Sequence, residues 1–172
     1  MSSGPLSSRC RSMGTVIGRD DLIKYVVNVQ ARTYEAFERL RDEHLEWRPA
    51  PGEFSFAELA LHIVAARRMN LLAIETGAPR YPGHEPTPGL TADRLRELCL
   101  RSGKKTVGVL ARADLERTIG NLAGDPFPAW KRVLGGLVEH EVHHRSQLCS
   151  YLAALGTEPP ALFGLRVEAL PR

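Results

Sequence analysis

Histidine and glutamate are concentrated in one short segment, LVEHEVHHRSQL, at residues 137–148. Residues 140–144 read H-E-x-x-H. In zinc metallopeptidases the two histidines of this motif bind the metal from one helix face and the glutamate is the general base. A five-residue motif also arises by chance. The segment therefore admits three interpretations: a peptidase, another kind of metal site, or a helix that is simply rich in histidine.

The segment lies in a predicted helix that runs from about residue 128 to Leu155. Pro128 suits a first helical turn, and Gly156 suits a stop. At about 100° per residue, a single stripe collects Val133, Leu137, His140, His144, Leu148, Tyr151 and Leu155. The apolar members make this stripe the predicted core face.

His140 and His144 are one turn apart on that stripe and point inward. Side chains at this spacing lie about 6 Å apart, which suits two ligands of one metal. His143 falls towards one edge of the stripe, where it is a possible spare ligand or an edge residue. Glu141 and Arg145 point away from the stripe, and we expect a surface or dimer role for Arg145.

A third inward-facing histidine is predicted on another helix. His62 shares a face with Leu59, Ala66, Met69 and Ala73. A single inward histidine is usually a core residue bonded to a carbonyl group, but burying two at i, i+4 without partners is costly. Together, His62, His140 and His144 favour a metal site built from facing helices. Neutral imidazoles suit Zn, Ni, Fe or Cu and leave a coordination position open.

The peptidase interpretation has little further support. After His144 the sequence continues Arg145, Ser146, Gln147, Leu148, without the downstream ligand of a zincin. The only later acids, Glu158 and Glu168, follow the end of the helix. An HExxH metallopeptidase therefore stays a remote alternative.

Four helices are expected, at residues 19–44, 55–77, 92–112 and 128–155. The second begins with the capping-box sequence SFAE at residues 55–58, and the third with Thr91 as its cap. No segment alternates as a strand does. The sequence thus predicts an all-α protein, a four-helix bundle.

Composition narrows the class of protein. Residues 1–14 are expected to be a disordered leader before a single domain at residues 15–172. The formal net charge is +3 without a basic stripe, and no apolar run has the length of a membrane span, so we expect neither nucleic-acid nor membrane binding. Three cysteines without C-x-x-C spacing indicate reduced thiols and a cytoplasmic protein.

Two longer segments carry a family resemblance. HEVHHRSQLCSYLAALGTEPP and EWRPAPGEFSFAELALHIV resemble the two signature segments of the DinB/YfiT-like family, in the family's order. The resemblance implies an up-down-down-up bundle, often dimeric, with a three-histidine site for one divalent metal per chain. Its ligands would be His62, His140 and His144, the set that the helical wheel also selects. Ser146 stands where the family commonly has glycine, away from the site face.

The resemblance also suggests an activity. Relatives include S-transferases that use low-molecular-weight thiols, and others described as hydrolases, so we expect a small-molecule substrate, a metal-dependent transferase or hydrolase, and a homodimer. Catalytic candidates are Gln147, about 20° from the direction of His140, Glu58, one turn before His62, and Tyr151, two turns after His144. Glu58 has a competing role in the capping box, and Tyr151 as plain core.

The alternative is a non-catalytic metal-binding protein, serving in stress response or as a binding module. A fourth protein ligand, such as His143 or Glu58, would close the coordination shell and favour it. Of the other histidines, His44 is expected to end the first helix, and His84 to be solvated in a loop.

Overall fold

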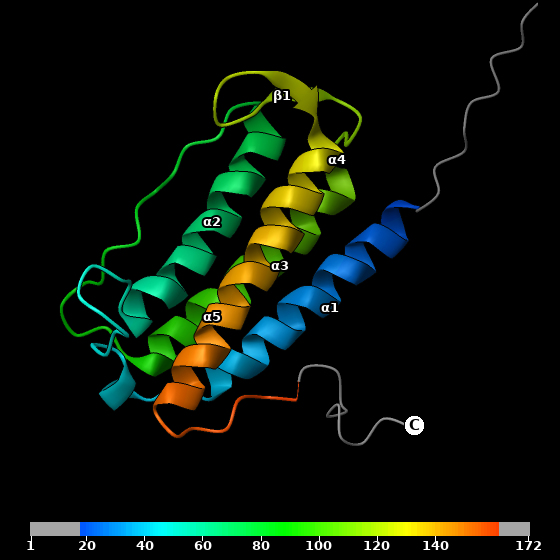
Figure 1. The fold of residues 1–172 in the computed structure, drawn as a ribbon. Helices are drawn as coiled ribbons and strands as arrows, with labels where there is room; N and C mark the ends of the chain where they lie inside the picture. The colour runs from blue at the N-terminus through cyan, green and yellow to red at the C-terminus, as the bar shows by residue number, and fades with distance from the viewer. Residues whose placement is uncertain (1–17, 162–172) are drawn as a thin grey trace, which may run out of the picture.

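The computed structural model describes residues 18–161, so the leader predicted at residues 1–14 lies outside the described part. Four long helices form a bundle: α1 (Arg19–Glu38), α2 (Phe56–Thr76), α3 (Ala92–Arg112) and α5 (His140–Ala154). In Figure 1, α1 and α5 run downwards while α2 and α3 run upwards, which is the up-down-down-up order. The predicted all-α four-helix bundle is confirmed.

The long connection between α2 and α3 allows these two helices to run in the same direction. Gly77 ends α2 with φ of 96°, a left-handed conformation that favours glycine. Residues 78–90 then return along the outside of α2 (Figure 1), and Thr91 caps α3 by accepting a hydrogen bond from the Arg94 backbone N–H. This connection places loop residues beside α2 (Figure 1).

The first helix is shorter than expected. It ends at Glu38, and an extended residue, Arg41, precedes a short 3₁₀ turn, η1 (Asp42–His44). His44 lies in this turn, buried against the ring of Phe56, so its predicted place at the end of the first helix is wrong. The turn places an aromatic contact under the start of α2.

A small hairpin lies where no strand was predicted. Strands β1 (Thr118–Gly120) and β2 (Pro126–Pro128) pair antiparallel across a turn that contains Gly124 at φ of 92°. They are three residues each and rich in Pro and Gly, so no alternating pattern marks them in the sequence. The hairpin closes the end of the bundle where α2 ends and the last helical run begins (Figure 1).

The last helical run is continuous but irregular. It begins with α4 (Ala129–Arg132), passes through a π-helical segment, η2 (Val133–Glu139), and continues as α5. Gly136 lies so close to α2 that a Cβ atom there would sit 2.2 Å from Asn70 Oδ1. Asn70 in turn donates to the carbonyl groups of Ala66 and Gly136. Wide helical turns of this kind are frequent at functional sites.

Two large apolar clusters fill the interior, and a small third one, of Ala73, Ile119 and Ala129, lies under the hairpin. One large cluster joins α1, α2, α3 and the end of α5, and the other joins α1, α2, α3 and η2. Cys99 is buried and Cys149 half-buried, and the two form no disulfide among the described residues; Cys10 lies outside them. Among the described helices, none combines the length and apolar character that crossing a membrane requires.

Candidate metal centre

Three imidazoles meet between α2 and α5. The Nε2 atom of His62 lies 3.1 Å from Nε2 of His140 and 3.1 Å from Nε2 of His144. The ligand atoms of the three residues all lie within 4.8 Å of one another. Metal–nitrogen bonds of about 2.0–2.1 Å place the nitrogens of a tetrahedral site about 3.3 Å apart. The spacing therefore fits one small metal ion held by the predicted residues.

The histidines are held in the neutral form that binds metal. Burial is the largest cause, and the neighbouring imidazoles add to it: together they lower the pKa of His62 to about 4 and that of His140 to about 4. Burial also lowers the pKa of His144. Neutral imidazoles keep a nitrogen lone pair for a metal, so the cluster is a ligand set at neutral pH.

Gln147, a predicted candidate, orients one of these ligands. Its Oε1 atom lies 2.6 Å from Nδ1 of His144, so in this orientation the imidazole donates from Nδ1. The proton is then on Nδ1, and the lone pair of Nε2 faces the other two histidines. Such partners of the outer ring nitrogen fix the tautomer of a metal ligand.

Tyr81 and His84 from the α2–α3 loop complete the surroundings of His62, and the sequence did not reveal them. The Tyr81 hydroxyl lies 2.7 Å from Nδ1 of His62 and 2.6 Å from Nδ1 of His84. The His84 ring also packs edge-on against Phe54. The expectation that His84 is merely solvated is wrong. The only signal was a tyrosine and a histidine three residues apart in a Pro/Gly loop, which has no helical period to orient them.

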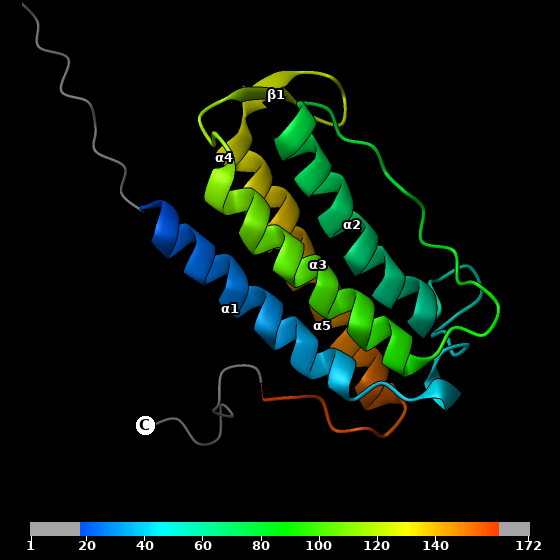
Figure 2. The same ribbon diagram turned by 180° about the vertical axis from the view of Figure 1, so that it is seen from behind.

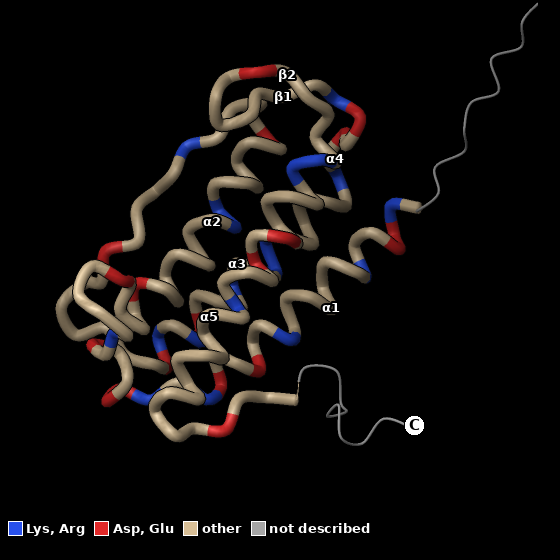
Figure 3. The backbone as a smooth tube through the Cα atoms, in the orientation of Figure 1, with Lys and Arg blue, Asp and Glu red and all other residues tan. Residues whose placement is uncertain are grey.

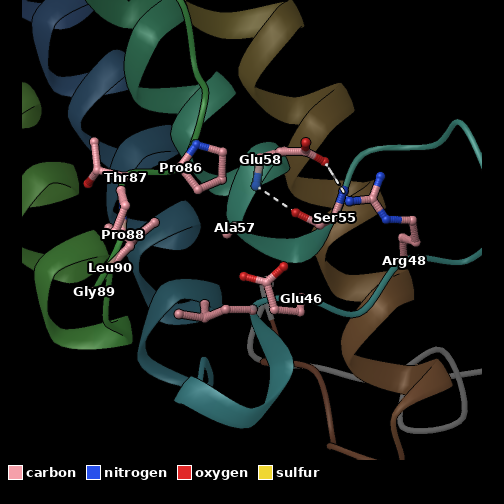
Figure 4. A pocket seen from close by; sticks show the side chains of 11 residues that line it. Glu46, Arg48, Ser55, Ala57, Glu58, Pro86, Thr87, Pro88, Gly89 and Leu90 are labelled. Carbon is pink, nitrogen blue, oxygen red and sulfur yellow. Dashed lines mark hydrogen bonds and ion pairs between the residues drawn. The ribbon is translucent and has the colours of Figure 1, made fainter.

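Glu58 and Tyr151 do not reach the three imidazoles. Ser55 and Glu58 form the predicted capping box: the Glu58 N–H donates to Ser55 Oγ and the carboxylate accepts from the Ser55 N–H (Figure 4). These bonds lower the pKa of Glu58. Both residues line a separate hollow of about 400 Å³, shown in Figure 4. Tyr151 does not line this hollow; it is core, with its hydroxyl donating to the Phe54 carbonyl.

The glutamate of the H-E-x-x-H motif faces away from the histidines. Glu141 is buried against Arg67 of α2, with N–O distances of 2.6 and 2.8 Å. Arg67 also donates to the Cys99 carbonyl and to Ser102 Oγ. A carboxylate engaged in this way is not placed as the general base of a peptidase. One indication of this buried pair is present in the sequence, because Arg67 is a charged residue within the apolar run of α2.

Arg145 is also inside the bundle. Its side chain donates to the Val29 carbonyl of α1, and it is only 4% exposed. The expected surface or dimer role is therefore wrong. The wheel placed Arg145 correctly off the histidine face, but α5 is covered by α1 on that side as well.

The cluster has no fourth protein ligand among residues 18–161. His143 is exposed on α5 and only packs its ring against that of His144, and Glu58 is committed to Ser55. Three neutral imidazoles without a closing side chain match the donor set of a catalytic rather than a structural zinc site.

A cavity opens beside the cluster on the side of the hairpin. It has a volume of about 430 Å³ and is lined by residues of α2, the hairpin, α4 and η2 and by His140. This volume lies in the range of small-molecule sites. A ligand in the cavity would therefore lie next to one of the three imidazoles.

Comparisons with known proteins agree with the fold. A DinB-like protein from Bacillus cereus shares 21% identity at a TM-score of 0.71, over 83% of this chain and 95% of that chain. A DinB-like protein from Bacillus subtilis shares 24% identity at a TM-score of 0.67, over 82% of this chain and 96% of that chain. YfiT from Bacillus subtilis shares 14% identity at a TM-score of 0.63, over 86% of this chain and 94% of that chain. It is described as a probable metal-dependent hydrolase with an unusual four-helix bundle topology. No curated protein is significantly similar in sequence.

The family of this chain is shown by its match to a family model. The model of the DinB superfamily matches residues 25–148, well over half of the chain. This range includes α2 and the H-E-x-x-H segment, and thus all three histidines of the cluster. With its four-helix bundle and its three converging imidazoles, the chain belongs to the DinB superfamily.

Proposed function

We propose that this protein is a metal-dependent enzyme in which His62, His140 and His144 bind one divalent metal ion, of zinc, nickel or iron. The convergence of three half-buried, neutral imidazoles, with no fourth protein ligand among the described residues, is the observation that carries the proposal. A metal at such a site lowers the pKa of a water or thiol at its open position and so supplies a nucleophile at neutral pH.

The residues around the cluster have separate tasks in this proposal. Gln147 and Tyr81 hold the outer ring nitrogens of His144 and His62 and thereby fix the directions of the inner ones. The cavity beside His140 receives the substrate. We assign no proton transfer to Glu141, because Arg67 binds its carboxylate.

Two activities share this site and differ in the nucleophile. Water gives a hydrolase, which is how YfiT is described. A low-molecular-weight thiol gives an S-transferase, as the sequence resemblance suggests. A non-catalytic metal protein is the alternative; it is disfavoured because the described residues offer no fourth ligand.

The first experiment measures metal content by inductively coupled plasma mass spectrometry on protein without a polyhistidine tag. We expect about one metal per chain, lost in His62→Ala and His144→Ala. His143→Ala is the matched control, because this exposed histidine lies on the same helix outside the cluster. Metal that persists in both ligand variants, or no metal after reconstitution with zinc, nickel and iron, would refute the proposal.

A second experiment identifies the nucleophile. Cobalt-substituted protein is titrated with 2-mercaptoethanol while its absorption spectrum is recorded. A new sulfur-to-cobalt charge-transfer band means that a thiol reaches the open position and favours the transferase. A spectrum that does not respond to the thiol favours the hydrolase.

We also propose that the chain forms a homodimer through α1 and α3, which lie side by side on the face seen in Figure 2. Val27, Leu100 and Val107 are exposed there, by 38%, 46% and 39%, around a largely apolar groove. Light scattering would give the mass in solution. Leu100→Lys should yield monomers, whereas Leu122→Lys, at an exposed leucine of the hairpin, should not; a monomeric parent protein would refute the dimer.

A further inference from the structure

The cavity beside His140 has an unusual lining. Met69, Leu122 and Phe127 form apolar walls, and Lys131 and Arg132 of α4 lie at the end towards the hairpin. The lining contains no aspartate or glutamate. Figure 3 shows α4 as a positively charged segment beneath the hairpin. The cavity thus combines an apolar wall, two cations and one face of the histidine cluster.

Arg132 is the residue that distinguishes this cavity. It is only 8% exposed, and its Nε atom has no hydrogen-bond partner among residues 18–161. One terminal nitrogen donates to the Gly120 carbonyl at 3.3 Å, and the guanidinium lies 5.0 Å from the centre of the Phe127 ring. No ion pair involves Arg132 within the described part of the chain.

Two other arginines are buried more deeply, and both have Glu141 nearby. Arg67 is 2% exposed, and Glu141 binds it through two oxygens, at 2.6 and 2.8 Å. Arg145 is 4% exposed and donates to the Val29 carbonyl; burial lowers its pKa, and the charge of Glu141 acts to raise it. Burial without a carboxylate lowers the pKa of Arg132, and burial is the only cause of that shift. A buried charge without a counter-charge is costly. A cation kept in that state beside a cavity is a ready partner for an anion.

Lys131 adds a second charge at the surface of the same cavity. It is exposed, makes no ion pair among the described residues, and its Nζ atom lies over the ring of Trp130, 5.7 Å from the ring centre. The nearest acid of the hairpin turn, Asp125, accepts a hydrogen bond from Asn121. Lysine at the entrance and arginine inside would attract an anion and then hold it.

We propose that this cavity binds the oxyanion group, carboxylate or phosphate, of the substrate, with Arg132 as its main anchor and Lys131 at the entrance. This inference deepens the proposed enzyme function and rests on it. Phe127, Leu122 and Met69 contact the apolar body of the substrate. Its other end lies at His140, where the metal would be held.

The positions of these residues set the form of the substrate. Arg132 and His140 are eight residues apart on one helical run, with the wide turns of η2 between them, so about two helical turns separate them along the axis. An organic anion that carries its charge at one end and its reactive group at the other fits this span. A free inorganic ion would fill only one end.

Calorimetric titration of the full-length, metal-depleted protein tests the inference. The probes are phenyl phosphate and benzoate, with benzyl alcohol as the neutral control. We expect the anions to bind and the alcohol not to bind, and the stronger anion identifies phosphate or carboxylate. Arg132→Gln should weaken binding about tenfold or more, and Arg132→Lys by less, because lysine keeps the charge but loses the paired donors. Arg101→Gln, on the exposed side of α3, should have no effect.

Lys131→Glu is a second test of the inference, for the case in which the variants of the buried Arg132 do not fold. Lys131 is exposed, so the fold should survive, as thermal unfolding would verify, while the reversed charge should weaken anion binding several-fold. Folded wild-type protein that binds neither anion, or anion binding unchanged in both Arg132→Gln and Lys131→Glu, would overturn the inference. Metal content, measured on the same preparations after reconstitution with zinc, separates the two proposals: anion binding by protein that takes up no metal refutes only the enzyme, and metal uptake without anion binding refutes only this cavity.

Discussion

At the scale of single residues, the site depends on how each imidazole is held. His62 and His144 each have a partner at Nδ1, which leaves Nε2 directed at the centre of the cluster. One partner, Gln147, is on the same helix as its histidine, three residues later. The other, Tyr81, comes from a loop. The first could be predicted from helical spacing, and the second could not.

Replacing these partners should loosen the metal without removing a ligand. We expect Gln147→Ala to weaken zinc affinity about tenfold, and Tyr81→Phe by a smaller factor, since losses of this kind run from about 10- to 100-fold and Tyr81 is 40% exposed. Gln147→Glu should retain affinity because a carboxylate also accepts from Nδ1. Competition with a chromogenic chelator measures the affinity. Ser146→Ala is the control, and unchanged affinity in Gln147→Ala would show that Gln147 does not orient His144.

At the scale of elements, α2 and the last helical run are joined by polar contacts as well as by the metal cluster. The Arg67–Glu141 ion pair crosses the interior from the residue that follows His140, and Asn70 donates to the Gly136 carbonyl of η2. These contacts fix how the two histidine-bearing helices face each other. They should therefore control both stability and the shape of the site.

Breaking the buried ion pair on one side should be strongly destabilising. Arg67→Met leaves the Glu141 carboxylate buried alone, and we expect a loss of about 3–5 kcal/mol in the free energy of unfolding, measured by urea titration. The double variant Arg67→Met/Glu141→Leu should recover much of that loss, because no charge is then buried. Glu97→Gln, which breaks an exposed pair on α3, should cost less than about 1 kcal/mol. Equal losses in all three variants would contradict this account.

The close approach at η2 gives a second test at this scale. A Cβ atom at Gly136 would meet Asn70 Oδ1 at 2.2 Å, whereas one at Gly135 would come no nearer than 3.9 Å to a side-chain oxygen of Glu139. Gly136→Ala should therefore destabilise the protein by about 1–3 kcal/mol and weaken metal binding. Gly135→Ala should be neutral or stabilising, because alanine favours helix. Thermal unfolding of the two variants tests this prediction. Equal melting temperatures would show that the contact with Asn70 does not restrict position 136.

At the scale of the whole molecule, the bundle keeps three imidazoles neutral before any metal arrives. Burial holds the pKa values of His62 and His140 at about 4, against 6.5 for an exposed histidine. The unfolded chain thus takes up protons at a higher pH than the folded one. The folded state is consequently favoured at neutral pH and penalised in mild acid.

Metal-depleted protein should therefore lose stability as the pH falls from about 6.5 to about 4. Below about pH 6.5 the histidines of the unfolded chain are protonated while those of the folded protein stay neutral. The loss of stability is complete once the pH falls to about 4, the pKa of His62 and His140 in the folded protein. The melting temperature, recorded across this range with chelator present, should fall less in His140→Gln than in the parent protein. His143→Gln, at an exposed position, is the control. If the melting temperature falls equally with pH in the parent protein and in His140→Gln, the prediction is contradicted.

The sequence by itself determined the four helices, the capping box at Ser55 and the three metal-binding candidates. It could do so because helical period is local: residues one turn apart share a face wherever the helix is packed. His140 and His144 were certain to be neighbours on this ground. Only the assignment of His62 needed a second helix, and the family resemblance supplied the same residue.

The tertiary structure alone decided which faces of α5 are covered and what lies around the histidines. Arg145 and Glu141 lie off the histidine stripe, yet both are buried, because α1 and α2 pack on either side of the helix. Tyr81 and His84 reach the cluster only because the α2–α3 loop returns along α2. Such contacts join residues far apart in the chain through packing and loop geometry, and no periodicity in the sequence encodes them.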